Sequence, residues 1–215
     1  DYGWPKENDW KMAANEGWKI IRLPFKWERI QREYYKDLHG PELAQMDQAL
    51  AWAEKYGIQV NLDMHNYFGR KINGTEHRIG TAQVPLAAWL DVWKRLASRY
   101  ANHKALWAFG VMNEPRGTNG EWWLAAQKAY DVIYSVAPNK WQTFCGDGYA
   151  NAHGWVGKNK NIDKFKGKMA IFEAHVYFDG DHKGTYGNRG EQIPGDIGVR
   201  RAQDFLKWLR DTGNR

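Results

Sequence analysis

The sequence predicts an α/β fold in which strands and helices alternate, and three observations favour a (β/α)8 TIM barrel. Short apolar runs alternate with amphipathic stretches, and no Pro-rich or Ser-rich linker divides the chain, which is the pattern of repeated βα units. No glycine-rich phosphate-binding turn follows the first strand, which disfavours the open doubly wound sheet that shares this alternation. Polar residues that can do chemistry instead follow several different strands, as catalytic groups do in a barrel.

Strand and helix candidates alternate strictly along the chain. The strand candidates are residues 18–24, 58–64, 106–112, 141–145 and 169–177, and the helix candidates are residues 8–16, 41–56, 86–100, 121–137 and 199–211. Gly17 and Gly57 follow two of the helices as C-terminal stops, and Pro41 occupies a first helical turn, where proline is tolerated. Apolar residues recur at helical spacing, so we expect the helices to pack one face on the sheet.

Composition indicates one globular domain over residues 1–215. No apolar stretch approaches the roughly 20 residues of a membrane span, and the net charge of +6 comes from basic residues dispersed among acidic ones. We therefore expect neither a membrane nor a nucleic acid as partner. Cys145 is the single cysteine, which excludes an internal disulfide and metal sets built on several cysteines.

Aromatic residues are abundant, with 13 Trp among the 215 residues. Most of them are expected to fill the core between helices and strands. The remainder suggest that a flat apolar ligand surface is bound, and the C–H face of a sugar ring is such a surface.

Residues 106–115 (LWAFGVMNEP) carry the sharpest functional signal. An apolar strand delivers Asn113 and Glu114 immediately before Pro115. A carboxyl group in that position points into the mouth of a barrel, where partial loss of water raises its pKa and suits it to act as a general acid. Spacing alone leaves open that Glu114 is a helix-cap or ion-pair residue of a loop.

Asn113-Glu114-Pro115 resembles the hallmark of glycoside hydrolase family 5, the cellulase family A. Matching motifs occur in the expected order at residues 21–25 (IRLPF) followed by Trp27, residues 63–67 (DMHNY), residues 89–100 (W-x3-W-x2-LA-x2-Y) and residues 172–179 (FEAHVYFD). The resemblance implies an endo-β-1,4-glucanase barrel of which the chain covers about the second strand to the sixth helix. The first, seventh and eighth strands are then missing.

The resemblance also implies roles for individual residues. Glu114 would be the acid/base, and Asn113 would bind the sugar 2-hydroxyl at the cleavage site. Arg22 would brace the nucleophile, while His175 and Tyr177 would contact the sugar and the nucleophile. Substrate-binding positions would be His65, Asn66, Tyr67, Trp27 and Trp155. The histidines and Arg22 could instead be satisfied structural residues.

The nucleophile of a retaining glycosidase is a second carboxylate roughly 5 Å from the first. In the family it is a Glu at the end of the seventh strand, which we expect to be absent from these 215 residues. Asp179 and Asp181 are weak substitutes in a loop, and Glu173 and Asp63 are expected to lie deeper in the barrel. The chain is then either a fragment of a longer product or is completed by a second chain or copy, because open sheet edges invite pairing.

Hydrolysis of internal β-1,4 bonds in cellulose or a related β-glucan by double displacement is the function that the resemblance implies, with mannan or xyloglucan as alternative substrates. Gly184-Thr185 resembles the corresponding loop of cellulases and favours glucan. A non-catalytic glucan-binding or assembly module is the alternative function. No cofactor or metal is expected, because carboxylates do this chemistry unaided. No signal peptide is visible, although a polymeric substrate favours a secreted, extracellular protein.

Overall fold

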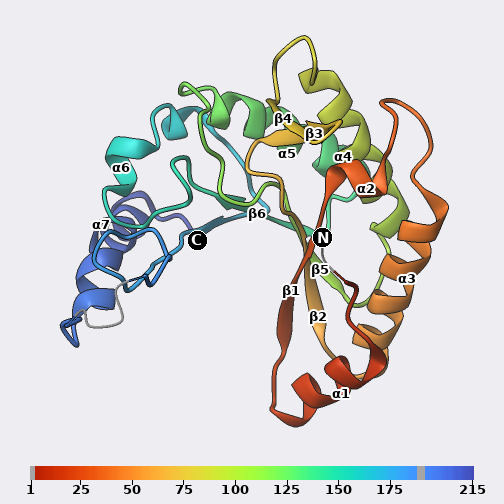
Figure 1. Cartoon of the computed structure of the whole chain (residues 1–215), viewed down its shortest axis with the longest axis horizontal. Helices are drawn as coiled ribbons and strands as arrows, with labels where there is room; N and C mark the ends of the chain where they lie inside the picture. Colours follow the sequence, from red (N-terminus) through yellow and green to blue (C-terminus); the bar gives the residue numbers. More distant parts are fainter. Residues whose placement is uncertain (1–2, 188–191) are drawn as a thin grey trace.

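A curved, five-stranded parallel sheet forms the centre of the computed structural model, which describes residues 3–187 and 192–215 (Figure 1). The strands are β1 (Ile20–Phe25), β2 (Gln59–Met64), β5 (Leu106–Gly110), β6 (Trp141–Cys145) and β7 (Ala170–Glu173), and they lie in the order β1-β2-β5-β6-β7. Every neighbouring pair is parallel. The sheet is a sector of a (β/α)8 barrel, as the sequence predicted.

Helices connect the strands and lie around the outside of the sheet (Figure 1). The longer helices are α1 (Glu7–Asn15), α3 (Gly40–Lys55), α4 (Leu86–Tyr100), α5 (Trp122–Val136) and α7 (Ile197–Thr212), each close to its predicted range. Shorter elements that the sequence analysis did not predict are α2 (Trp27–Ile30), the antiparallel hairpin β3 (Gly69–Ile72) and β4 (Thr75–Arg78), α6 (Trp155–Lys158) and the 3-10 turn η1 (Ile162–Lys164). Within the described residues, no helix has the length and hydropathy needed to cross a membrane.

Aromatic side chains fill the layer between the helices and the sheet, which confirms that most tryptophans belong to the core. The indole N–H of Trp93 in α4 donates to the carbonyl of Val111 at 3.2 Å, and its ring meets the edges of Phe25 and Phe109 from two strands. The buried tryptophans are Trp10, Trp27, Trp89, Trp93, Trp122, Trp123, Trp155 and Trp208. Each fully buried aromatic contributes on the order of 1.5–3 kcal/mol of hydrophobic stabilisation.

Two strands end earlier than the sequence predicted. β5 ends at Gly110, where an added Cβ would lie 3.0 Å from Asp63 Cα in β2, so a larger residue would have to displace the neighbouring backbone. The backbone of Asn113 still donates to the Met64 carbonyl at 2.9 Å before the chain turns away at Glu114. β7 ends at Glu173, because His175 pairs with the loop residues Ala150 and Ala152 instead of with β6.

The outer edge of β7 is partly occupied. The amide of Phe172 donates to the carbonyl of Arg215 at 2.7 Å, so the last residue of the sequence lies beside this strand.

Gly146 lies directly after β6 against the indole of Trp155. We expect Gly146→Ala to lower the free energy of unfolding by about 1–3 kcal/mol, because the new methyl group would overlap with the Trp155 ring. Chemical denaturation measures this loss. Gly157→Ala is the matched control, since no atom lies within 4 Å of the added Cβ and the residue is in α6; equal destabilisation by the two variants would contradict the prediction.

Candidate active site

Glu114 lies at the carboxyl end of β5 with a left-handed backbone conformation, φ +41°. Its Oε1 contacts His175 Nδ1 at 2.6 Å and accepts a hydrogen bond from the Tyr177 hydroxyl at 2.8 Å. The side chain is largely buried. A non-glycine residue with positive φ carries a conformational cost that surrounding contacts must offset. The structure therefore brings together three of the residues predicted from sequence, and two of them hold the same carboxylate oxygen of Glu114.

The imidazole of His175 lies between two carboxylates. Nδ1 faces Glu114, and Nε2 faces Glu173 Oε1 at 2.9 Å. Cys145 Sγ lies 3.9 Å from the same Nε2. Glu173 and His175 are two residues apart, so their side chains leave the chain on one face. The sequence analysis predicted neither the contact of Glu173 with His175 nor that of Cys145 with His175. The signal for the Glu173 contact was the two-residue spacing, which places residues 173 and 175 on one face of a strand.

Arg22 in β1 connects the neighbouring strands. One amino group lies 3.1 Å from Asp63 Oδ1 and donates to Asn113 Oδ1 at 2.6 Å, while Nε lies 3.0 Å from Glu173 Oε1. Asp63 Oδ2 contacts His65 Nδ1 at 2.8 Å. A continuous network of charged groups therefore runs across the carboxyl ends of the strands beneath Glu114.

The pKa of Glu114 lies below its ordinary value, which contradicts the expectation that loss of water raises it. Burial does raise the pKa, but the hydrogen bonds from His175 and Tyr177 together outweigh this effect. Burial lowers the pKa of His175, yet its contacts with Cys145, Glu114 and Glu173 raise it to about 12. In this structure an imidazolium holds Glu114 as a carboxylate.

The charged cluster predicts how stability depends on pH. His175 has a raised pKa, so its contribution to stability is full below its ordinary value of 6.5 and is lost as the pH rises towards 12. Glu114 and Glu173 have lowered pKa values, so their contributions are present above 4.5 and are lost as the pH falls through the lowered values. We expect thermal stability to be greatest between about pH 4.5 and 6.5 and to decline by pH 9.

Thermal unfolding of His175→Gln at the same pH values checks this expectation, because the variant should lose the alkaline decline. His77→Gln, in the β3–β4 hairpin, is the control that should retain it. If the thermal stability of His175→Gln depended on pH as that of the unmodified chain does, the alkaline decline would come from groups other than His175.

The predicted substrate-binding residues differ in their surroundings. His65 is partly exposed and contacts the Tyr67 hydroxyl at 3.1 Å through Nε2. Asn66 is buried and committed internally, since its Oδ1 accepts the Trp27 amide at 2.9 Å and its Nδ2 donates to Glu28.

Trp27 and Trp155 are fully buried. Trp155 packs against Phe205 and Trp208 of α7, and Trp27 forms a cation–π contact with Arg70. Neither indole presents a ring face to solvent, so the two tryptophans are core residues and we do not retain them as stacking surfaces.

The other acidic residues near Glu114 have structural partners. Asp179 accepts hydrogen bonds from the backbone amides of residues 184–186 at 2.8–3.2 Å, and Asp181 pairs with Lys183 at 3.0 Å. Glu173 and Asp63 share the guanidinium of Arg22. Each of the four carboxylates considered as a substitute nucleophile therefore already has a partner among the described residues.

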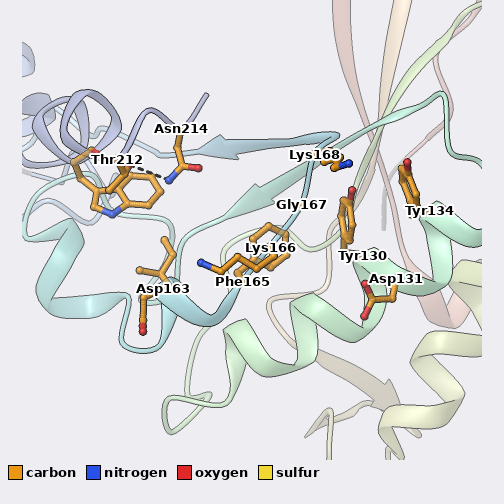
Figure 2. Close-up of a pocket in the computed structure, with 12 residues that line it drawn as sticks. Tyr130, Asp131, Tyr134, Asp163, Phe165, Lys166, Gly167, Lys168, Thr212 and Asn214 are labelled. Atoms are coloured by element: carbon orange, nitrogen blue, oxygen red, sulfur yellow. Dashed lines mark hydrogen bonds between the residues drawn. The ribbon is translucent and has the colours of Figure 1, made fainter.

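A cavity of about 720 Å³ opens beside Glu114 and is lined by Tyr149, Asn151, Tyr177 and His182, among others. A second cavity, of about 900 Å³, lies where β7 begins, at the opposite end of the sheet. Figure 2 shows Tyr130 and Tyr134 of α5 at this second cavity, with Asn214 of the C-terminal segment. Functional sites of barrels lie at the carboxyl ends of the strands, so the cavity beside Glu114 is the candidate substrate site.

A parallel sheet sector with acid, imidazole and guanidinium groups gathered at the carboxyl ends of its strands defines a protein of the (β/α)8-barrel class. A family model described as Cellulase (glycosyl hydrolase family 5) matches residues 2–215. The chain belongs to this family.

Named relatives agree with the assignment. The chain is 30% identical over 193 residues to endoglucanase EG-II of Hypocrea jecorina, an alignment that covers 81% of this chain and 43% of that protein. It is 34% identical over 147 residues to an endoglucanase of Paenibacillus polymyxa, covering 60% of this chain and 36% of the relative. Endoglucanase Cel5A of Pseudomonas stutzeri superposes with a TM-score of 0.92 at 35% identity, covering 99% of this chain and 66% of Cel5A. The chain thus spans less than half the length of these two named relatives and just under two thirds of Cel5A.

Proposed function

We propose that this chain forms most of a retaining glycoside hydrolase that cleaves internal β-1,4 bonds of cellulose or a related β-glucan. The observation that carries the proposal is the placement of Glu114 at the end of β5, with its carboxyl group held by His175 and Tyr177 beside an open cavity. Membership of a family whose named relatives are endoglucanases supports the same reaction.

In the proposed mechanism, Glu114 protonates the oxygen of the departing sugar while a second carboxylate attacks the anomeric carbon. Glu114 then removes a proton from the water that hydrolyses the glycosyl ester. Residues outside this sequence supply the nucleophile in this proposal, and Arg22 braces it. Asn113 Nδ2 is buried and has no hydrogen-bond partner among the described residues, which leaves it available to a sugar hydroxyl.

The lowered pKa of Glu114 is consistent with a nucleophile that comes from outside the sequence. A second carboxylate roughly 5 Å away would raise the pKa of Glu114 by repulsion between like charges. Glu114 would then retain its proton near neutral pH. Without the second carboxylate, the hydrogen bonds from His175 and Tyr177 lower the pKa of Glu114 and favour loss of this proton.

Glucan binding without cleavage is the second candidate function. It is favoured by the structural commitments of Glu173, Asp63 and Asp179, which leave none of these carboxylates free to attack a substrate.

Reducing-sugar release from barley β-glucan and carboxymethyl cellulose tests the proposal. Two proteins are compared: the 215-residue chain, and a completed chimaera in which the strands that this chain lacks relative to Pseudomonas stutzeri Cel5A are joined to it. We expect turnover by the chimaera with retained anomeric configuration, and oligosaccharide binding without turnover by the chain alone. Inverted products would refute the retaining mechanism, and binding without products by a folded chimaera would favour the second function.

The remaining assignments depend on the substrate class. The endoglucanase relatives support β-glucan over mannan or xyloglucan. Because a polymeric glucan cannot enter a cell, we place the protein outside the cell. The missing strands come from a continuation of the same product or from a second chain or copy.

A further inference from the structure

Three side chains of different chemistry converge beneath Glu114. Cys145 ends β6, Glu173 ends β7 and His175 follows two residues later. One ligand-type atom from each, Sγ, a carboxylate oxygen and a ring nitrogen, lies within 4.8 Å of the other two. The proposed glycosidase mechanism gives no role to the Cys145 thiol or to the grouping of these three atoms.

We propose that Cys145, Glu173 and His175 form a binding site for a thiophilic divalent cation such as Zn²⁺, held through Sγ, Oε1 and Nε2. Zn²⁺ takes thiolate sulfur, imidazole nitrogen and carboxylate oxygen at about 2.0–2.3 Å, which places its ligand atoms roughly 3.3–3.7 Å apart in a tetrahedron. The observed separations are 3.9 Å from Sγ to Nε2 and 2.9 Å from Nε2 to Oε1. The third separation, from Sγ to the carboxylate oxygen of Glu173, is at most 4.8 Å. Side-chain shifts on the order of 1 Å therefore bring the three ligand atoms to tetrahedral spacing.

The surroundings of the three ligands match those of a zinc site. A metal-bound imidazole usually gives its other N–H to a carboxylate, and His175 Nδ1 already contacts Glu114 Oε1 at 2.6 Å. Arg22 Nε lies 3.0 Å from Glu173 Oε1 as an ion-pair partner, without the geometry of a hydrogen bond. Cys145 is buried, whereas the side chains of Glu173 and His175 are each 21% exposed, so the cation enters from their side.

The exchange leaves the net charge of the cluster unchanged. Bound Zn²⁺ replaces the Sγ–H proton of Cys145 and the Nε2–H proton of His175, so two protons leave as two positive charges arrive. The charge of Arg22 remains balanced by Asp63 at 3.1 Å. The bound ion lies next to Glu114, so if Glu114 acts as proposed above, Zn²⁺ inhibits hydrolysis. The binding site itself does not depend on that function.

Titration of the untagged 215-residue chain with Co²⁺, a spectroscopic probe for zinc sites, tests the proposal without any measurement of turnover. Cys145 is the single cysteine, so thiolate-to-cobalt absorption can arise from one residue only. We expect this absorption to saturate at one Co²⁺ per chain and to disappear when Zn²⁺ is added. Cys145→Ala should abolish the absorption, with thermal unfolding confirming that the variant is folded.

Two further variants make the test specific. Glu173→Gln should weaken Co²⁺ binding at least about tenfold while the thiolate absorption persists, because even groups one shell out from a metal affect its affinity by that factor. His153→Ala is the control for surface binding, since the rings of His153 and His182 lie 5.0 Å apart and offer a competing histidine pair. Cobalt binding without thiolate absorption, or binding that His153→Ala abolishes and Cys145→Ala leaves intact, would overturn the assignment.

Discussion

Glutamine in place of Glu114 is expected to reduce hydrolysis of barley β-glucan by the completed chimaera about 10²–10⁴-fold, the usual contribution of a positioned general acid. The amide has nearly the same shape and can still accept the hydrogen bond from the Tyr177 hydroxyl. It cannot deliver a proton to a departing sugar oxygen. Initial rates on the polymer, at a substrate concentration well above KM, measure the loss in kcat directly.

A substrate with an acidic phenol as leaving group separates proton donation from general damage. Its departure needs little help from an acid, so formation of the glycosyl-enzyme should slow far less in Glu114→Gln than cleavage of the polymer does. Glu54→Gln, at the far end of α3, is the matched control and should retain full activity. Unimpaired cleavage of the natural polymer by Glu114→Gln would remove Glu114 from the mechanism.

Replacement of Arg22 by Leu is expected to lower the free energy of unfolding by at most about 3–5 kcal/mol, the usual cost of removing one partner from a fully buried ion pair. The loss should fall below this limit because the Arg22 side chain is 30% exposed. Asp63 would lose its guanidinium partner while its side chain is only 2% exposed. Glu173 would lose a second contact, at 3.0 Å. Urea denaturation at pH 7 measures the change. At lower pH the deficit should shrink, because protonation of Asp63 removes the uncompensated charge.

Arg200→Leu is the matched control for Arg22→Leu. Arg200 pairs with Asp196 on the exposed first turn of α7, at 3.2 Å. Exposed pairs of this spacing contribute only about 0.3–0.5 kcal/mol. Comparable losses in the two arginine variants would show that burial does not strengthen the role of Arg22.

Much of the fold could be predicted from sequence because parallel strands buried on both faces leave continuous apolar runs, and the helices between them show regular apolar spacing. The β3–β4 hairpin escaped prediction because residues 69–78 are mostly polar. Its signal was the Asn73-Gly74 pair, in which both residues have positive φ, the conformation that a tight hairpin turn requires.

The residues of the candidate site could be predicted because they occur in short motifs at the ends of strands. Which polar groups meet there depends on the relative positions of separate strands, so the contact of Cys145 with His175 could not be read from spacing. The direction of the Glu114 pKa shift was wrong for the same reason, since it depends on two hydrogen bonds from distant residues. Trp27 and Trp155 were misassigned because an indole suits a core as well as it suits a sugar.

The hydrogen bond from Phe172 to Arg215 bears on how a missing strand would assemble. A parallel strand that slips by one residue turns its inward side chains outward, so an empty sheet edge offers several competing alignments. Here one backbone hydrogen bond to the outer edge of β7 is already formed, and it favours one alignment over the others. A strand aligned by this hydrogen bond would pair with β7 after a shorter search among alignments, and this would reduce the opportunity for mispaired or aggregated forms during folding.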